Sequence, residues 1–291
     1  IIAEGDYSSA ADTLYECAIY MVQSRPWQVE KLDWVGRKAY VTRTHVDYYT
    51  DAIDYTRLKS LSEFASTSSG AGSAAHGEAH VVRRVAGYKK IRYYSHENIG
   101  YGPVNLPDQE LQTTAVWWRV PGAALDAAFP SRHMALDGFL GAAYALHTVA
   151  CVLSMAEPRD LGRAVGSGEG EWSAQVSSKG RGEMRNARGE VVDPGSCELF
   201  APVVHLYDNY PGGIGISQPL YERSVELLDA AAALIDGCRC QHGCPACIGP
   251  ILSGEDRSAK ANARGILSLL GASGPQPSAS ECKSPPRERL H

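Results

Sequence analysis

Half of the eight cysteines in this 291-residue chain lie in one short stretch, CRCQHGCPACIGP, which covers residues 238–250. Cys238, Cys240, Cys244 and Cys247 follow the pattern C-x-C-x3-C-x2-C. Four thiolates at this spacing can surround one zinc ion tetrahedrally, with Zn–S distances of about 2.3 Å. Because the protein then fills all four positions, no place is left for a catalytic water. The pattern therefore predicts a single structural Zn²⁺ that holds the end of one helix against the start of the next.

Three other interpretations of this loop stay open on the sequence. Two disulfides need an oxidising compartment and would be strained in so short a loop. An iron–sulfur cluster also takes four cysteines, but its common spacings are wider than C-x-C. His242 can replace one thiolate as a ligand. The other cysteines, at positions 17, 151, 197 and 282, are too scattered for a disulfide framework. Zinc in a reducing, cytoplasmic setting fits best.

A second candidate is the glycine-rich stretch DNYPGGIGIS, residues 208–217, between a predicted strand and a predicted helix. Phosphate-binding loops occupy such positions. This stretch has no lysine and does not match the Walker A pattern, and Asp208 would repel a phosphate. We favour a tight strand-to-helix turn that places Gly212, Gly213 and Gly215 at positive φ.

A third candidate is the basic segment HVVRRVAGYKKIRYY, residues 80–94, which contains no acidic residue. If its end is a strand, Tyr88, Lys90, Arg92 and Tyr94 share one face, with Lys89 on the other. A face of alternating bases and tyrosines suits a nucleic-acid backbone and a stacked base. An edge strand that its charges protect against aggregation explains the pattern equally well.

His133 and Asp137 lie four residues apart on a predicted helix. They can form a catalytic pair, although an ordinary hydrogen-bonded helix pair is more common. The chain has no Walker motif, no DEAD or DEAH box, no G-x-S-x-G and no H-E-x-x-H. No complete catalytic set is therefore recognisable.

The composition is that of a soluble globular protein, with 44% hydrophobic and 21% charged residues and a net charge of −5. A nucleic-acid surface would therefore have to be a local patch. The first residues, IIAEGDYSSA, do not resemble a signal peptide. The apolar stretch at 135–155 contains an aspartate and a histidine, which favours a buried core helix over a membrane span.

The hydrophobic pattern predicts an α+β protein. Short alternating runs over residues 1–121 predict an antiparallel β-barrel-like subdomain, interrupted by a mobile loop at 65–79. Of the adjacent Trp117 and Trp118, one is expected in the core and one exposed. The pattern over residues 122–271 predicts a helical subdomain, in which Ser131 caps the main helix. It also contains an irregular insert at 165–196 and the zinc loop at 238–247, and the tail at 272–291 is expected to be disordered.

Several segments together resemble one family. They include VEKLDWVGRKAYVTRTHVDYYTDA, YKKIRYYSHENIGYGPVNLP, ELQTTAVWW, EPRDLG, LYDNYPGGIGISQPLYERSVELL and CRCQHGCPACIGP. This set is similar to the C-terminal zinc-binding domain of DEAD/DEAH-box helicases of the mitomycin-repair (MrfA) type. The similarity spans nearly the whole chain outside the loops and the tail, and the insert departs from the family pattern.

The resemblance implies an accessory part of a superfamily 2 DNA helicase that acts in DNA repair. Upstream motor domains of the same protein would bind ATP and Mg²⁺ and move along single-stranded DNA. The four cysteines would hold the zinc, and the zinc-stapled part would rigidify the helicase and help line the DNA path, without contact to a membrane. The alternative is a zinc-stabilised protein–protein adaptor that does not touch DNA.

Overall fold

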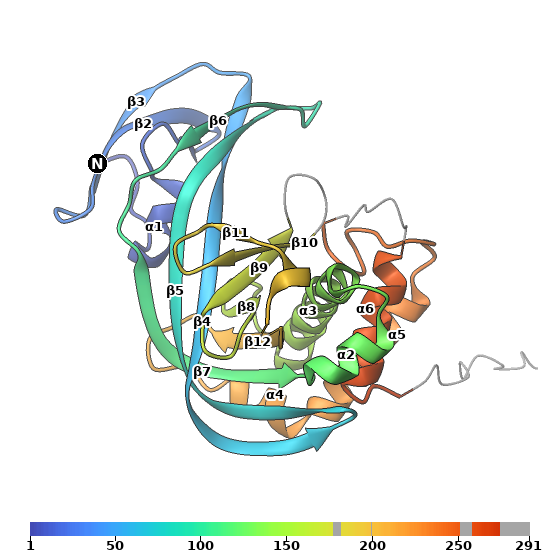
Figure 1. The fold of residues 1–291 in the computed structure, drawn as a ribbon. Coiled ribbons are helices and arrows are strands. Elements are labelled where there is room, and N and C mark those ends of the chain that lie inside the picture. Colours follow the sequence, from blue (N-terminus) through green and yellow to red (C-terminus); the bar gives the residue numbers. More distant parts are fainter. Residues whose placement is uncertain (177–181, 199, 251–257, 274–291) are drawn as a thin grey trace, which may run out of the picture.

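The chain folds into two antiparallel sheets and a group of helices (Figure 1). The computed structural model describes residues 1–176, 182–198, 200–250 and 258–273. The small sheet has the order β1-β2-β3, and the large sheet has the order β11-β10-β9-β8-β12-β7-β5-β4, with β6 paired to β5. In the part of the chain described, both sheets are open, so "barrel-like" is a loose description, while the predicted α+β class is confirmed.

The strands and helices alternate in blocks along the chain. The strands are β1 Ile19–Val22, β2 Arg25–Asp33, β3 Lys38–Arg43, β4 Tyr48–Ser69, β5 Gly72–Arg92, β6 Asn98–Pro103, β7 Gln109–Arg119, β8 Leu161–Gly166, β9 Trp172–Val176, β10 Gly182–Asn186, β11 Val191–Val192 and β12 Val203–Asp208. The helices are α1 Tyr7–Thr13, α2 Gly122–Ala128, α3 Arg132–Ser154, the 3-10 turn η1 Pro194–Ser196, α4 Ser217–Glu222, α5 Ser224–Gly237 and α6 Ala259–Leu269.

The longest feature is the hairpin of β4 and β5, and it overturns the loop predicted at 65–79. Residues 65–69 end β4, residues 72–79 begin β5, and the turn lies at Gly70, which has φ +57°. The small residues of the β5 half of this segment are buried: Ala74 is fully covered, and a Cβ on Gly77 would collide with a neighbouring backbone carbonyl. The low hydrophobicity therefore reflects close packing of backbones, not mobility.

Coiling of the large sheet brings its edge strand β4 against strands β8 and β9. The backbone N–H of Ser60, in β4, donates to the carbonyl of Gly168 in the β8–β9 turn at 2.9 Å. Leu58, Trp117 and Val203 lie in the small core that this coiling encloses. Trp118 points to the opposite face and is also fully buried. The expectation of one exposed tryptophan is therefore wrong, because both faces of the sheet are covered.

Strand β12 joins the early and late parts of the chain in one sheet. It pairs with β7 on one side and with β8 on the other. The boundary predicted at residue 121 marks a change from strand to helix along the chain, but the sheet continues across it. The predicted insert at 165–196 contributes β9, β10, β11 and η1 to the same sheet and its edge.

Helix α3 packs across one face of the large sheet and contacts α5 and α6 on its other side (Figure 1). Its N-cap is Ser131, whose side chain accepts a hydrogen bond from the backbone N–H of Met134, as predicted. Its length and apolar composition alone would allow it to cross a membrane, but 61% of its most apolar window is buried inside the protein. It is the central helix of the main hydrophobic core.

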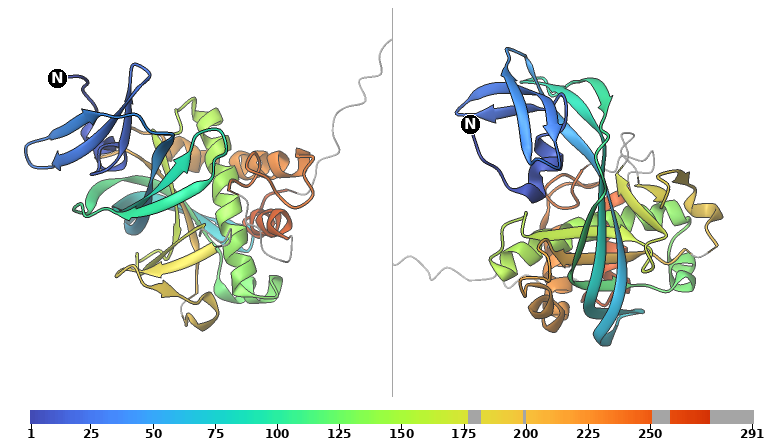
Figure 2. Two further views of the ribbon diagram at one scale, coloured as in Figure 1. Left: turned by 90° about the horizontal axis from the view of Figure 1, so that it is seen from above. Right: turned by 90° about the vertical axis from the view of Figure 1, so that its left-hand side faces the viewer.

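Helix α1, the small sheet and the ends of β4, β5 and β6 form a second structural region. Its core contains Tyr15, Ala18, Val29 and Tyr88. The small sheet and helices α5 and α6 lie at opposite ends of the molecule (Figure 2). Residues 274–291, which make up most of the predicted disordered tail, lie outside the described residues.

Candidate metal centre

The four cysteine side chains of the zinc loop converge on one point. All four Sγ atoms lie within 4.8 Å of one another. The distances are 3.5 Å for Cys238–Cys244, 3.5 Å for Cys240–Cys247 and 3.7 Å for Cys244–Cys247. A tetrahedron with Zn–S bonds of about 2.3 Å has S···S edges of about 3.8 Å. The four sulfurs thus fit a closed zinc site without a ligand from His242.

Local backbone geometry produces this convergence. Cys238 directly follows the last residue of α5. A tight turn then places Cys244 and Cys247 together, since the backbone N–H groups of Cys247 and Ile248 both donate to the carbonyl of Cys244 at 3.1 Å. Gly243 has φ +117°, and a Cβ there would collide with the Ile248 side chain. Only glycine permits this turn.

The pKa values of two of the four thiols are shifted in opposite directions. A hydrogen bond from the backbone of Ala246 is the main cause that lowers the pKa of Cys244 to about 7. Burial raises the pKa of Cys247 to about 12. A Cys247 thiolate therefore needs a cation beside it, which a bound Zn²⁺ supplies.

A lysine that the sequence did not single out connects this loop to the last helix. Lys260, in α6, donates from Nζ to the carbonyls of Cys238 at 2.7 Å and Cys240 at 2.9 Å. Its backbone N–H also donates to the carbonyl of His242 at 3.1 Å. Zinc with four thiolates carries a net charge of −2, so the partly buried ammonium group of Lys260 offsets part of it. No spacing rule could have found Lys260, because it lies beyond the motif.

The loop is part of the main core and also packs on α3. Cys247 and Ile248 are almost fully buried. Gly141 in α3 allows this approach, since a Cβ there would lie 2.8 Å from the Cβ of Ala263 and 3.3 Å from that of Ile248. Gly249, at φ +81°, lies against the ring of Tyr144. The cysteine loop therefore fastens three helices, α3, α5 and α6, and not only the two between which it lies in the sequence.

The DNYPGGIGIS loop forms a turn around one carboxylate. Asp208 is fully buried at the end of β12. Its Oδ2 accepts hydrogen bonds from the backbone N–H groups of Ile214 (2.7 Å), Gly215 (2.8 Å) and Ile216 (3.1 Å). Its Oδ1 accepts from the N–H of Ser217 at 3.0 Å. The donors that a phosphate would need are thus satisfied by the chain's own carboxylate.

The glycines of this loop behave as predicted. Gly212, Gly213 and Gly215 have φ values of +78°, +79° and +86°. A Cβ on Gly213 would collide with Oγ1 of Thr114, whereas Gly212 and Gly215 have no atom within 4 Å of that position. Gly213 is therefore required for both its conformation and its lack of a side chain.

The EPRDLG and DNYPGGIG segments contact each other. The Tyr210 hydroxyl donates to Oδ1 of Asp160 at 2.7 Å, and the side chain of Asn209 donates to the carbonyl of Arg159 at 3.0 Å. Arg159 itself pairs with Glu157 at 2.7 Å. The side-chain hydrogen bond from Tyr210 raises its phenol pKa. Two segments about 50 residues apart thus form one surface structure.

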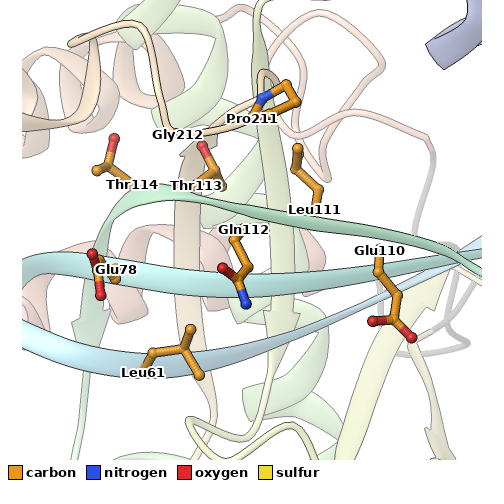
Figure 3. Close-up of a pocket in the computed structure, with 9 residues that line it drawn as sticks. All are labelled: Leu61, Glu78, Glu110, Leu111, Gln112, Thr113, Thr114, Pro211 and Gly212. Atoms are coloured by element: carbon orange, nitrogen blue, oxygen red, sulfur yellow. The ribbon is translucent and has the colours of Figure 1, made fainter.

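A pocket of about 380 Å³ lies beside the Asp208 turn (Figure 3). Its walls come from β4, β5, β7 and the loop residues Pro211 and Gly212. Glu78 and Glu110 supply carboxylates, and Leu61 and Leu111 supply apolar surface. Thr113 and Thr114 lie between the pocket and the turn, and both hydroxyls donate to Asp208. The pocket is thus built on the same structure that holds the turn together.

The residues of the basic segment at 80–94 do not form one continuous strand face. Strand β5 ends at Arg92, and Tyr94 follows in a turn at φ +66°, fully exposed. Tyr88 is buried and stacks on Tyr15 with ring centroids 5.2 Å apart, so its ring cannot stack a base. The prediction that one strand face carries both tyrosines is therefore wrong.

The bases of this segment remain at the surface. The Lys90 ammonium lies 5.3 Å from the centre of the Tyr48 ring. Arg92 pairs with Asp47 at 3.3 Å and Glu97 at 3.5 Å. Lys89 lies on the other face, between Asp51 of β4 and Tyr101 of β6. Nucleic-acid binding by these residues stays a prediction.

His133 and Asp137 contact different elements. His133 lies 3.1 Å from Asp193, and both side chains are about half exposed. Asp137 accepts a hydrogen bond from the backbone N–H of Gly182 at 2.6 Å. Both partners come from the insert at 165–196. The contacts are those of a helix that holds an adjoining hairpin, which is an ordinary structural role.

Comparison with known proteins shows what this centre is similar to. Residues 142–248, which include all four cysteines, match the family model of the MrfA Zn-binding domain. The chain is 34% identical over 270 residues to an uncharacterized ATP-dependent helicase, YprA, of Bacillus subtilis; the match covers 93% of this chain and 31% of YprA. A stretch of 46 residues is 39% identical to an uncharacterized protein of Methanocaldococcus jannaschii, covering 16% of this chain and 41% of that protein.

Two crystal structures of the DUF1998 helicase MrfA resemble the fold. The one bound to DNA has a TM-score of 0.58 at 31% identity, and the match covers 91% of this chain and 31% of that one. The other has a TM-score of 0.54 at 28% identity, with 93% and 32% covered. The chain spans about a third of the length of these helicases. By its matched residues, its fold and its four-cysteine centre, the chain is similar to the zinc-binding part of MrfA-type helicases.

Proposed function

We propose that this chain is the accessory zinc-binding part of an ATP-dependent DNA helicase that works in DNA repair. One structural Zn²⁺, held by Cys238, Cys240, Cys244 and Cys247, would fix α3, α5 and α6 as one block. Motor domains in the same protein would bind ATP and Mg²⁺. The single observation that carries the proposal is the convergence of four sulfurs in a core that matches an MrfA Zn-binding domain.

The mechanical role follows from how the centre is built in. The cysteine loop belongs to the same hydrophobic core as α3 and as Trp118 of the large sheet. Loss of the metal would leave Cys247 buried without a cation and would loosen contacts on three helices. The zinc therefore acts on the shape of the whole zinc-bearing end of the molecule. Such a rigid block suits a helicase part that must hold its position while a motor moves along DNA.

DNA contact is supported by similarity to a helicase whose crystal structure contains DNA. The partly exposed Lys89 and Lys90 and the exposed Arg92 are candidates to line the path of a single strand. Binding through phosphates would weaken as salt rises, because counterions are released on binding. A cytoplasmic location would fit thiolate ligands, which a reducing compartment preserves.

The metal role is tested with Cys247→Ser, and with Cys197→Ser as the matched control. Elemental analysis is expected to find one zinc per chain in the parent and the control, and far less in Cys247→Ser. Because metal binding contributes to folding, Cys247→Ser should also unfold at lower temperature. A Cys247→Ser variant with normal zinc content and stability would refute the metal role.

The helicase role is tested in a protein that carries the motor together with this region. Cys247→Ser should lower DNA unwinding, while Cys197→Ser should not. If the zinc-loaded chain binds the motor but binds no single-stranded DNA even at low salt, the adaptor alternative holds instead. Normal unwinding by a zinc-free variant would refute the accessory role.

A further inference from the structure

Three arginines from distant parts of the chain line one small pocket. Arg57 lies in β4, Arg84 in β5 and Arg185 in β10. Arg57 and Arg84 extend from the same face of the hairpin, since Tyr55 pairs with Arg84 and Arg57 with Val82 in the ladder. The pocket is completed by Tyr55, Val82, Ser173, Asn186, Ala187 and Gly189. The β9–β10 hairpin thus closes over the basic face of the long hairpin.

The charges in and around this pocket are not balanced. Arg84 makes a paired contact with Asp108, at 2.6 and 2.7 Å. Arg185 pairs with Glu183 at 2.5 Å. Among the described residues, the Arg57 side chain makes no direct hydrogen bond or ion pair; its charge acts on Asp108, the carboxylate that Arg84 already binds. Three guanidinium groups share two carboxylates, which leaves one positive charge, and Arg57 is the arginine without a direct contact to either carboxylate.

Arg185 is held in a fixed position at the wall of the pocket. Its guanidinium lies 4.9 Å from the centre of the Tyr55 ring, and Nη1 donates to the carbonyl of Gly189 at 2.7 Å. These contacts, together with the ion pair to Glu183, keep its positive charge beside Arg57 and Arg84.

The size of the pocket limits what can enter. Its volume is about 30 Å³, which is room for about two water molecules. Phosphate oxygens fit such a space, but a base or a sugar does not. Guanidinium groups bind phosphate strongly because their planar donors match two oxygens at once.

We propose that the Arg57–Arg84–Arg185 pocket binds a phosphodiester group of a nucleic-acid strand. The site rests on the proposed function, which supplies the strand, and adds a specific contact to it. It differs from the Lys89–Lys90–Arg92 segment predicted from the sequence. Free inorganic phosphate has the same oxyanion chemistry, so the test must distinguish the two sources.

The test uses Arg57→Gln in the zinc-loaded chain, with Arg25→Gln as the matched control. Arg25 is also basic and is exposed, but it lies in β2 of the small sheet. Because the Arg57 side chain makes no direct hydrogen bond or ion pair among the described residues, Arg57→Gln should fold with a nearly unchanged unfolding midpoint. Fluorescence anisotropy with a labelled single-stranded oligonucleotide should show about fivefold weaker binding for Arg57→Gln. The slope of log affinity against log salt should fall by about 0.7, as for one lost phosphate contact on a single strand.

Arg57→Lys should lie between the parent and Arg57→Gln, because it keeps the charge but not the planar donors. Equal losses in Arg57→Gln and Arg25→Gln, with binding otherwise retained, would overturn this site and leave the proposed function standing. If only inorganic phosphate binding depends on Arg57, the phosphodiester assignment is wrong. If the parent chain binds no oligonucleotide at low salt, the DNA contact of the proposed function fails together with this site.

Discussion

Replacing Asp208 by asparagine tests whether its carboxylate organises the DNYPGGIGIS turn. The two side chains have nearly the same shape, so the change removes charge and one acceptor without creating a cavity. Asparagine can place its single oxygen where Oδ2 now accepts three backbone N–H groups. Its amide nitrogen then faces the N–H of Ser217, which loses its acceptor.

The expected loss of stability can be summed from these contacts. A hydrogen bond to a charged acceptor contributes about 1.5–3 kcal/mol and a neutral one about 0.5–1.5 kcal/mol. Three weakened bonds therefore cost about 3 kcal/mol, and the unsatisfied Ser217 donor adds about 1 kcal/mol. A total near 4 kcal/mol is a large part of the roughly 5–15 kcal/mol that stabilises a typical domain.

The measurement is urea unfolding of the zinc-saturated chain, followed by tryptophan fluorescence. Asp47→Asn is the control, because Asp47 is a largely exposed carboxylate paired with Arg92 and surface pairs contribute about 0–1 kcal/mol. A loss in Asp208→Asn no greater than that in Asp47→Asn would refute the reasoning. It would mean that the turn forms without an anion at its centre.

Two further predictions concern the glycines and a buried histidine. Gly213→Ala should destabilise the chain more than Gly212→Ala: both positions have φ near +79°, but only at Gly213 does the new Cβ meet Thr114. Equal unfolding midpoints for the two variants would contradict this. Burial lowers the pKa of His205 to about 3, against 6.5 in the unfolded chain. The folded state therefore binds fewer protons, and its stability should fall as pH drops below about 6.5. His205→Leu should remove much of this acid sensitivity in unfolding titrations from pH 7 to 4, whereas His133→Gln, at an exposed site, should not; an unchanged profile in His205→Leu would contradict the assignment.

The features predictable from the sequence are those fixed by local spacing. The four cysteines lie so close along the chain that their convergence needs one turn, and C-x-C-x3-C-x2-C already specifies its shape. Gly212, Gly213 and Gly215 likewise reveal a turn, because few other residues adopt positive φ. The Ser131 cap follows from the same kind of local rule.

The features that could not be predicted depend on contacts between distant segments. The alanines and glycines of 65–79 have a loop-like composition, and only the strands packed against them explain why small residues are needed. Asp208 was expected to repel a phosphate, but its pairing with four backbone donors depends on the fold of the following turn. Lys260, Arg57 and Arg185 lie in no recognisable motif, because their partners are distant in sequence.

The position of β12 has a consequence for attempts to divide the molecule. This strand joins β7 to β8 in the large sheet, although β7 and β12 are separated by more than 80 residues in the chain. A truncation after residue 121 would expose the unpaired edge of β7, and the complementary fragment would expose that of β12. Such edges recruit other strands and promote aggregation. The zinc-bearing residues and the long hairpin should therefore be expressed, and should unfold, as one cooperative unit.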